Sequence, residues 1–73
     1  MDPKDLRDYL NERGCRLHRK HHSGIEVWRK PGLNKPIQFY NLGPVQAGEL
    51  ARITEALGVN LNDLGNWRKK QGV

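Results

Sequence analysis

The stretch RKHHSGIEVW, residues 19–28, holds the side chains of this chain that best suit chemistry on a phosphate ester. His21 and His22 can exchange protons near neutral pH, and Arg19 and Lys20 can hold a phosphate group. A histidine beside a cation can assist attack of an RNA 2′-hydroxyl on the neighbouring phosphate. We therefore predict His22 as proton acceptor, His21 as its substitute, and Arg19 or Lys20 as the phosphate ligand. The alternative is a solvated, positively charged turn.

The same region raises the question of a metal site. Cys15, His18, His21 and His22 are spaced C-x₂-H-x₂-H-H, and a thiolate with imidazoles would suit zinc. If residues 15–20 form a strand, however, Cys15 and His18 project from opposite faces and cannot share one ion. Cys15 is better suited to packing as a small apolar residue. We predict no metal site, and cleavage would need no cofactor.

The elements that must position these residues follow from the pattern of apolar positions. Asp2 and Pro3 are typical of a helix start, and Gly14 is typical of a helix end, so the spacing predicts a helix over 3–13. Apolar and polar residues then alternate in three short runs, which predicts an antiparallel sheet with one buried face. These runs cover residues 15–20, 25–28 and 37–40.

The alternation assigns a face to each strand residue. The residues expected to point inward are Cys15, Leu17, Ile25, Val27, Ile37 and Phe39. Those expected to point outward are Arg16, His18, Lys20, Trp28, Lys30, Gln38 and Tyr40. Aromatic rings can stack on bases and cations can hold phosphates, so this face is a predicted binding surface. The residues predicted to bind RNA are Arg16, His18, Arg19, Lys20, Trp28, Lys30 and Tyr40.

The rest of the chain is predicted to be helical. A second helix starts near Val45 or Gln46 and ends at Gly58, and Asn60 can cap a short third helix. The predicted fold is α+β, with three antiparallel strands and two helices on one sheet face. A chain of 73 residues is expected to form one domain, with an ordered core over about 3–67 and a basic tail over 68–73.

The balance of charged residues limits the classes of molecule that this chain is expected to bind. Lys and Arg number 13 against 8 Asp and Glu, and the resulting net charge of +5 favours a polyanionic partner, either nucleic acid or an acidic protein. One cysteine excludes an internal disulfide and fits a reducing compartment. The sequence has no apolar run of membrane-spanning length and does not begin like a secretory signal. We therefore expect a cytoplasmic protein that does not enter membranes.

Three stretches of the sequence resemble a known family. LRDYLNERGCRLHRK, GIEVWRKPG and GPVQAGELARITEALGVNLNDL, within residues 5–64, are similar to the HicA family of small mRNA-cleaving toxins from bacterial toxin–antitoxin pairs. The resemblance implies a fold like the double-stranded-RNA-binding domain, with element order α-β-β-β-α. It also implies an endoribonuclease that needs no metal, with RNA as substrate and a cognate antitoxin as partner.

The chain departs from that family at one position. The family's catalytic histidine follows the glycine before the second strand, and here Ile25 follows Gly24. Isoleucine cannot exchange a proton, so either His21 or His22 reaches the same place or the chain only binds RNA. Two other functions stay open. One is a protein-interaction module that docks through Trp28 and Tyr40, and the other is a DNA-binding regulator that uses the closing helices.

Overall fold

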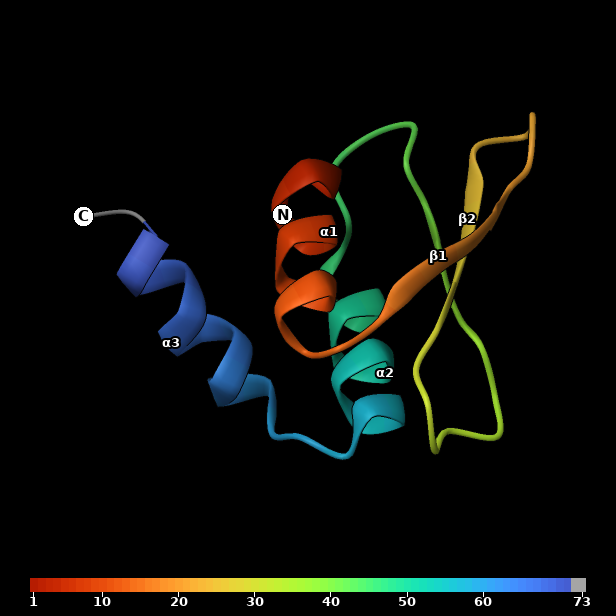
Figure 1. The fold of residues 1–73 in the computed structure, drawn as a ribbon. Helices are drawn as coiled ribbons and strands as arrows, with labels where there is room; N and C mark the ends of the chain where they lie inside the picture. The colour runs from red at the N-terminus through yellow and green to blue at the C-terminus, as the bar shows by residue number, and fades with distance from the viewer. Residues whose placement is uncertain (72–73) are drawn as a thin grey trace.

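The chain forms two layers, a three-stranded antiparallel sheet and helices that cover one of its faces (Figure 1). The computed structural model describes residues 1–71. The strand order is β1-β2-β3, so β1 and β3 are the two edges of the sheet. The elements are α1 (Pro3–Glu12), β1 (Arg16–Lys20), β2 (Ile25–Arg29), β3 (Ile37–Tyr40), α2 (Ala47–Leu57) and α3 (Leu61–Gln71). The predicted α+β class with an antiparallel sheet is confirmed.

The helix boundaries have local causes that the sequence contains. The Asp2 carboxylate accepts a hydrogen bond from the Lys4 amide at 2.9 Å, which satisfies one free N–H at the start of α1. Gly58 ends α2 in the left-handed conformation, with φ of +75°, which glycine adopts without steric cost. The helix over 3–13 ends one residue earlier than predicted, and the second helix starts at Ala47.

Helix α3 is longer than predicted. It continues to Gln71, so residues 68–71 of the predicted basic tail are helical, and residues 72–73 lie outside the described part of the chain. The Trp67 indole N–H donates to the Glu12 carboxylate at the end of α1, and its ring is buried. This contact near the middle of α3 holds the helix against α1. The last turn of α3 therefore extends from a part of the helix that is already packed.

A second polar contact joins α3 to α1. The Tyr9 hydroxyl donates to the Asp63 carboxylate at 2.6 Å, and the Arg13 guanidinium forms an ion pair with the same group at 2.9 Å. Hydrogen bonds from Tyr9 and Arg13 hold the pKa of Asp63 below its ordinary value.

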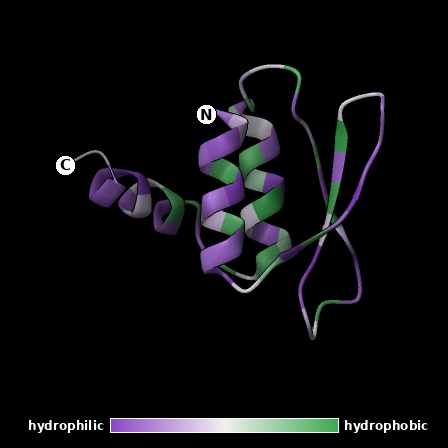
Figure 2. Cartoon of the chain, turned by 45° about the horizontal axis from the view of Figure 1, so that its top comes forward, coloured by the Kyte–Doolittle hydropathy of each residue, from purple (hydrophilic) through white to green (hydrophobic). Residues whose placement is uncertain are grey.

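Figure 2 shows the hydrophobic residues of α1 and α2 on their packed sides and hydrophilic residues along most of β1. None of the described helices is long and apolar enough to cross a membrane.

The faces of β2 are the reverse of those predicted. Glu26 and Trp28 point into the core, with 0% and 3% of their surface exposed, whereas Ile25 and Val27 are only half-buried. The pairing agrees, because Trp28 lies opposite Ile37 and Glu26 opposite Phe39, and both of these β3 residues are buried as predicted. Burying an indole removes more apolar area from water than burying a valine, which favours this orientation.

The inward orientation of Glu26 requires hydrogen-bond donors, and the fold provides three. Arg7 of α1 forms an ion pair with the carboxylate at 2.5 Å, the Trp28 indole donates at 3.1 Å, and the Asn41 amide donates at 2.7 Å. Burial opposes the charged form, but hydrogen bonds from Arg7, Asn41 and Trp28 outweigh it and hold the pKa of Glu26 below its ordinary value. Glu26 thereby links α1, β2 and the segment after β3.

The lowered pKa of Glu26 predicts a loss of stability in acid. A carboxylate with a depressed pKa in the folded state stabilises the protein above its unfolded pKa of about 4.3, and this contribution disappears as pH falls through the folded pKa. Glu26→Gln should lower the free energy of unfolding by about 2 kcal/mol near pH 7, because it loses charge-assisted hydrogen bonds. The variant should also lose stability less steeply in acid. Urea unfolding from pH 7 to pH 3 measures both effects.

The exposed substitution Asp5→Asn on α1 is the control, since it removes a carboxylate that makes no ion pair among the described residues. Equal acid sensitivity in Glu26→Gln and the native chain would contradict the assignment of this stability to Glu26.

Candidate nucleic-acid interface

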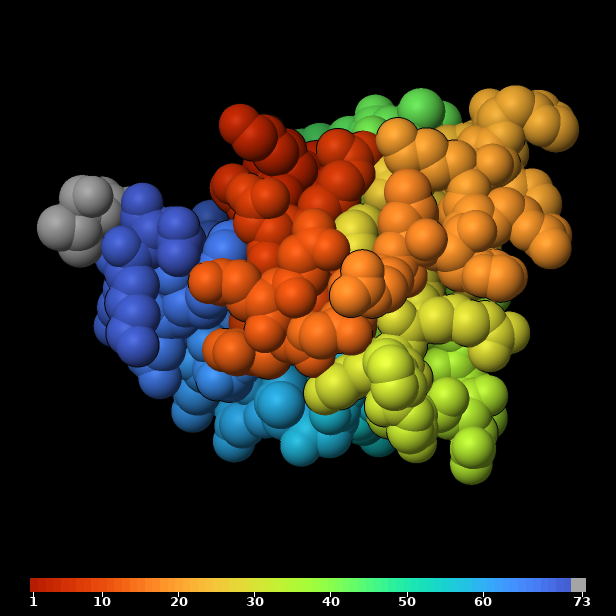
Figure 3. All heavy atoms as spheres, viewed as in Figure 1, coloured from red at the N-terminus to blue at the C-terminus, as the bar shows by residue number. Residues whose placement is uncertain are grey.

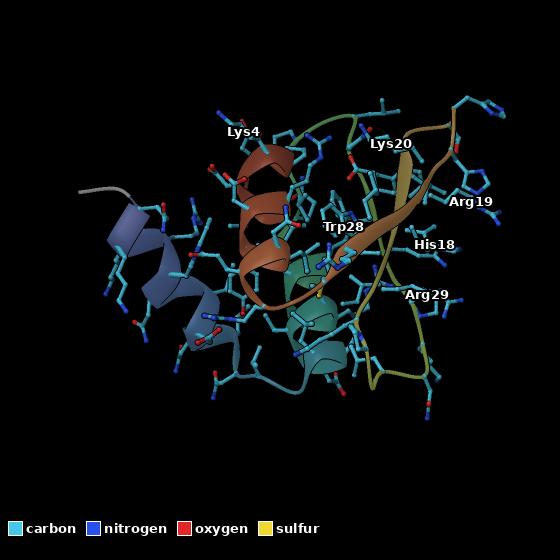
Figure 4. All side chains as sticks on the ribbon, in the orientation of Figure 1. Lys4, His18, Arg19, Lys20, Trp28 and Arg29 are labelled. Atoms are coloured by element: carbon cyan, nitrogen blue, oxygen red, sulfur yellow. The ribbon has the colours of Figure 1, made fainter. Side chains whose placement is uncertain are left out.

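The face of the sheet that turns away from the helices gathers arginines from two strands. In an antiparallel pair, residues opposite each other place their side chains on the same face. Arg16 lies opposite Arg29, and Arg19 lies opposite Val27, which in turn lies opposite Gln38. Figure 4 shows Arg19 and Arg29 pointing away from the helices, as does His18, where the register of β1 shifts.

A third set of residues that lie opposite each other across the strands completes this face, at the hairpin between β1 and β2. The His21 amide donates to the Ile25 carbonyl at 2.8 Å, and the Gly24 amide donates to the His21 carbonyl at 3.0 Å. Gly24 has φ of +96°, so the loop is a three-residue hairpin turn that ends in a left-handed glycine. His21 therefore lies opposite Ile25, which pairs with Tyr40 on β3. Tyr40 is 54% exposed.

We call this surface the outer sheet face. Its members are Arg16, His18, Arg19, His21, Ile25, Val27, Arg29, Gln38 and Tyr40. It carries no carboxylate, because from Arg13 to Gly48 the sequence has seven Lys and Arg but a single acidic residue, Glu26, which points into the core. Neither of the two ion pairs formed by the described residues includes Arg16, Arg19 or Arg29. These guanidinium groups are therefore available to an anionic ligand.

The structure separates the predicted RNA-binding residues into two groups. Arg16, His18 and Tyr40 lie on the outer sheet face as the alternation predicted. Arg19, which the alternation left out of the outward set, joins them because the register of β1 shifts between Leu17 and Arg19. Trp28 does not, because its ring is in the core and its N–H is bonded to Glu26. Two lysines are also absent from this face. Lys20 lies opposite Glu26 on the helix-facing side, and Lys30 follows β2 and is half-buried.

The predicted inward set also needs correction on β1. Cys15 is buried as predicted, but Leu17 is 43% exposed although it lies opposite Trp28 on the helix-facing side. β1 is an edge strand, so a residue on its inner side is covered less fully than one on the central strand β2. The predicted catalytic residues His21 and His22 are both exposed in the hairpin. Neither side chain forms a hydrogen bond or an ion pair with another of residues 1–71.

Arg29 is the arginine of the outer sheet face that the sequence analysis did not predict. The alternation IEVWR has two possible faces, and the choice of Ile25 and Val27 as the buried set placed Arg29 with them on the inward side. The size of Trp28 was the signal for the opposite choice. Its burial turns Ile25, Val27 and Arg29 outward together.

The structure offers little for metal or thiol chemistry. Among residues 1–71, no group of three or more His, Cys, Asp and Glu side chains is close enough to hold a metal ion. The Cys15 thiol is buried, and burial raises its pKa despite the opposing charge of Lys30. Cys15 therefore keeps its proton near neutral pH and packs as an apolar residue.

Comparisons with protein-family models, curated proteins and solved structures found no match to this chain.

Two aromatic substitutions test the assignment of faces. Trp28→Ala should lower the free energy of unfolding by about 3–5 kcal/mol, because it leaves a cavity in the core. Tyr40→Ala removes an exposed ring from the same sheet and should change it by no more than about 0.5 kcal/mol. Chemical denaturation of both variants measures the difference. Equal losses, or a larger loss for Tyr40→Ala, would contradict the orientation of β2.

Proposed function

We propose that this protein binds unpaired RNA through the outer sheet face. The observation that carries the proposal is the trio Arg16, Arg19 and Arg29 on one open face without a carboxylate among them. Guanidinium groups hold phosphates by paired hydrogen bonds, and Tyr40 offers an exposed ring on which a base can stack. Ile25 and Val27 lie between these groups and add apolar contact for a base.

The geometry favours unpaired RNA over the alternatives. A sheet face with an aromatic ring can contact bases only when they are splayed out of a duplex, as in single strands and loops. Docking of a protein through Trp28 and Tyr40 loses its larger anchor, because Trp28 is in the core. Duplex DNA binding by the closing helices has less support, since α2 uses its apolar stripe, which includes Leu50 and Ile53, in the core.

The relation to HicA toxins is part of this proposal. The order α1-β1-β2-β3-α2 supports it, because the same order is expected of that family's fold. Figure 1 adds that α1 and α2 lie on the same side of the sheet. A cytoplasmic site of action and a cognate antitoxin would follow from membership of this family.

RNA cleavage is a second candidate function, and the hairpin geometry favours it. Ile25 occupies the position of the family's catalytic histidine, and His21 lies directly across the hairpin from it. Side chains of such a pair are neighbours on one face, with Cβ atoms about 5 Å apart. An imidazole at residue 21 is thus close to the place where the family has its own. We propose His21, rather than His22, as the general base, with Arg19 beside it on the outer sheet face.

Charge reversal tests the binding proposal. Arg19→Glu/Arg29→Glu should weaken binding of a fluorescein-labelled, mostly unpaired RNA by at least about tenfold, and should lower the salt dependence of binding by about two phosphate contacts. The control is Arg68→Glu/Lys69→Glu on α3, which changes net charge equally but lies off the sheet. Fluorescence anisotropy over a range of salt concentrations gives both quantities. Equal losses in the two double variants would show a nonspecific charge effect and contradict the proposal.

Cleavage is tested separately from binding. The native chain is incubated with the same RNA at neutral pH in chelator, beside His21→Ala and His22→Ala, and products are resolved on a denaturing gel. We expect cleavage that His21→Ala reduces at least about a hundredfold and His22→Ala leaves largely intact. Intact RNA under conditions in which the native chain binds it would exclude cleavage and leave the binding proposal standing.

A further inference from the structure

A cleft on the helix-facing side of β1 adjoins the outer sheet face and shares Arg16 with it. It lies between α1 and β1, has a volume of about 540 Å³ and includes Lys4, Asn11, Arg16, Leu17, Lys20 and Trp28 in its lining. Figure 3 shows this cleft from its open side, between the red helix and the orange strand. Figure 4 places Lys4 and Lys20 on the α1 side of the strand, opposite to Arg19. The cleft runs along an edge of the sheet, because β1 has a strand neighbour only in β2.

The backbone of β1 has polar groups that face this open edge. In an antiparallel ladder, successive residues point their N–H and C=O groups alternately toward and away from the neighbouring strand. The His21 amide points toward β2, since it donates to the Ile25 carbonyl. The N–H and C=O of the preceding residue, Lys20, therefore point away from β2. An edge with such groups is a template for an added strand.

We propose that the β1 edge binds an extended acidic segment of a partner protein, which adds to the sheet as a fourth strand. Backbone hydrogen bonds to an edge strand supply affinity in this mode, and side chains at alternate positions supply specificity. Lys4, Arg16 and Lys20 line the cleft and are absent from the ion pairs of the described residues, whereas Arg7 is already paired with Glu26. Their charge is complementary to Asp and Glu.

Apolar contact adds to this charge complementarity. Leu17 is 43% exposed at the cleft, and its side chain lies on the same side of the sheet as Lys20. Side chains of an added strand alternate between the two faces of the sheet. A segment with an acidic and an apolar residue two positions apart could therefore place both on the cleft side, the acidic one near Lys20 and the apolar one against Leu17. The only carboxylate in the lining is Asp8.

The edge is unsuited to pairing with a second copy of this chain. β1 reads RLHRK, so two copies side by side would bring cations opposite cations, which is destabilising. The irregular register between Leu17 and Arg19 and the presence of Lys20 are also features that natural edge strands use against self-association. The same charges that reject a second basic strand attract an acidic one. The preferred occupant is thus an acidic partner strand.

The proposal is tested with a short synthetic peptide that has glutamate and valine in turn at every second position, threonine at the positions between them, and a fluorophore. We expect the native chain to bind this peptide, and the amide of Lys20 to exchange with solvent more slowly in the complex. The matched control is the same peptide with N-methyl groups on alternate backbone amides, which keeps its charge but removes donors. It should bind at least about tenfold more weakly, because one lost hydrogen bond corresponds to about that factor.

Variants of the protein separate this cleft from the RNA surface. Lys4→Glu/Lys20→Glu should abolish peptide binding, whereas Arg19→Glu/Arg29→Glu should retain it within about threefold, since those arginines lie on the outer sheet face. Circular dichroism checks that both variants are folded. Equal binding of the N-methylated peptide, or an unchanged exchange rate for the Lys20 amide, would overturn strand addition. These outcomes do not depend on RNA binding.

Discussion

The arrangement of the whole sheet depends on how Glu26 is held in the core. A carboxylate without exposed surface is tolerated only when donors compensate for the loss of water, and Arg7, Trp28 and Asn41 supply them. These donors come from α1, from β2 itself and from the segment after β3. Glu26 therefore does more than accept hydrogen bonds. Its donors make possible the orientation of β2 that burial of Trp28 favours, and the ion pair with Arg7 fixes α1 against the sheet.

The orientation of β2 in turn determines the surface chemistry of the molecule. Once Glu26 points inward, the long stretch from Arg13 to Gly48 presents cations to solvent without an exposed carboxylate. The acidic residues that remain lie on the helices or at their ends. The sheet layer is consequently basic on the outer sheet face and along its β1 edge, while the helix layer balances much of its own charge. A modest net charge of +5 is concentrated on one layer.

Some of this could be predicted from the sequence, and some could not. The helix starts and ends depend on nearby residues such as Asp2 and Gly58, so their positions could be predicted within two residues. The face of β2 depends on donors that are distant in sequence, since Arg7 lies 19 residues before Glu26 and Asn41 lies 15 residues after it. The size of Trp28 favours the observed face, but local alternation cannot reveal the distant donors that make burial of Glu26 possible. The extension of α3 likewise depends on Glu12, which is 55 residues from Trp67.

The most direct test of the account is a nuclear magnetic resonance titration of the labelled protein with unpaired RNA. The account predicts that the side-chain Nε–H signals of Arg19 and Arg29 and the amide signals of Ile25 and Tyr40 shift as RNA is added. The amide signals of α3 should stay in place, as should the indole signal of Trp28, whose N–H is bonded to Glu26. Shifts confined to α2 and α3, with β1 and β2 unaffected, would contradict the outer sheet face as the RNA-binding surface.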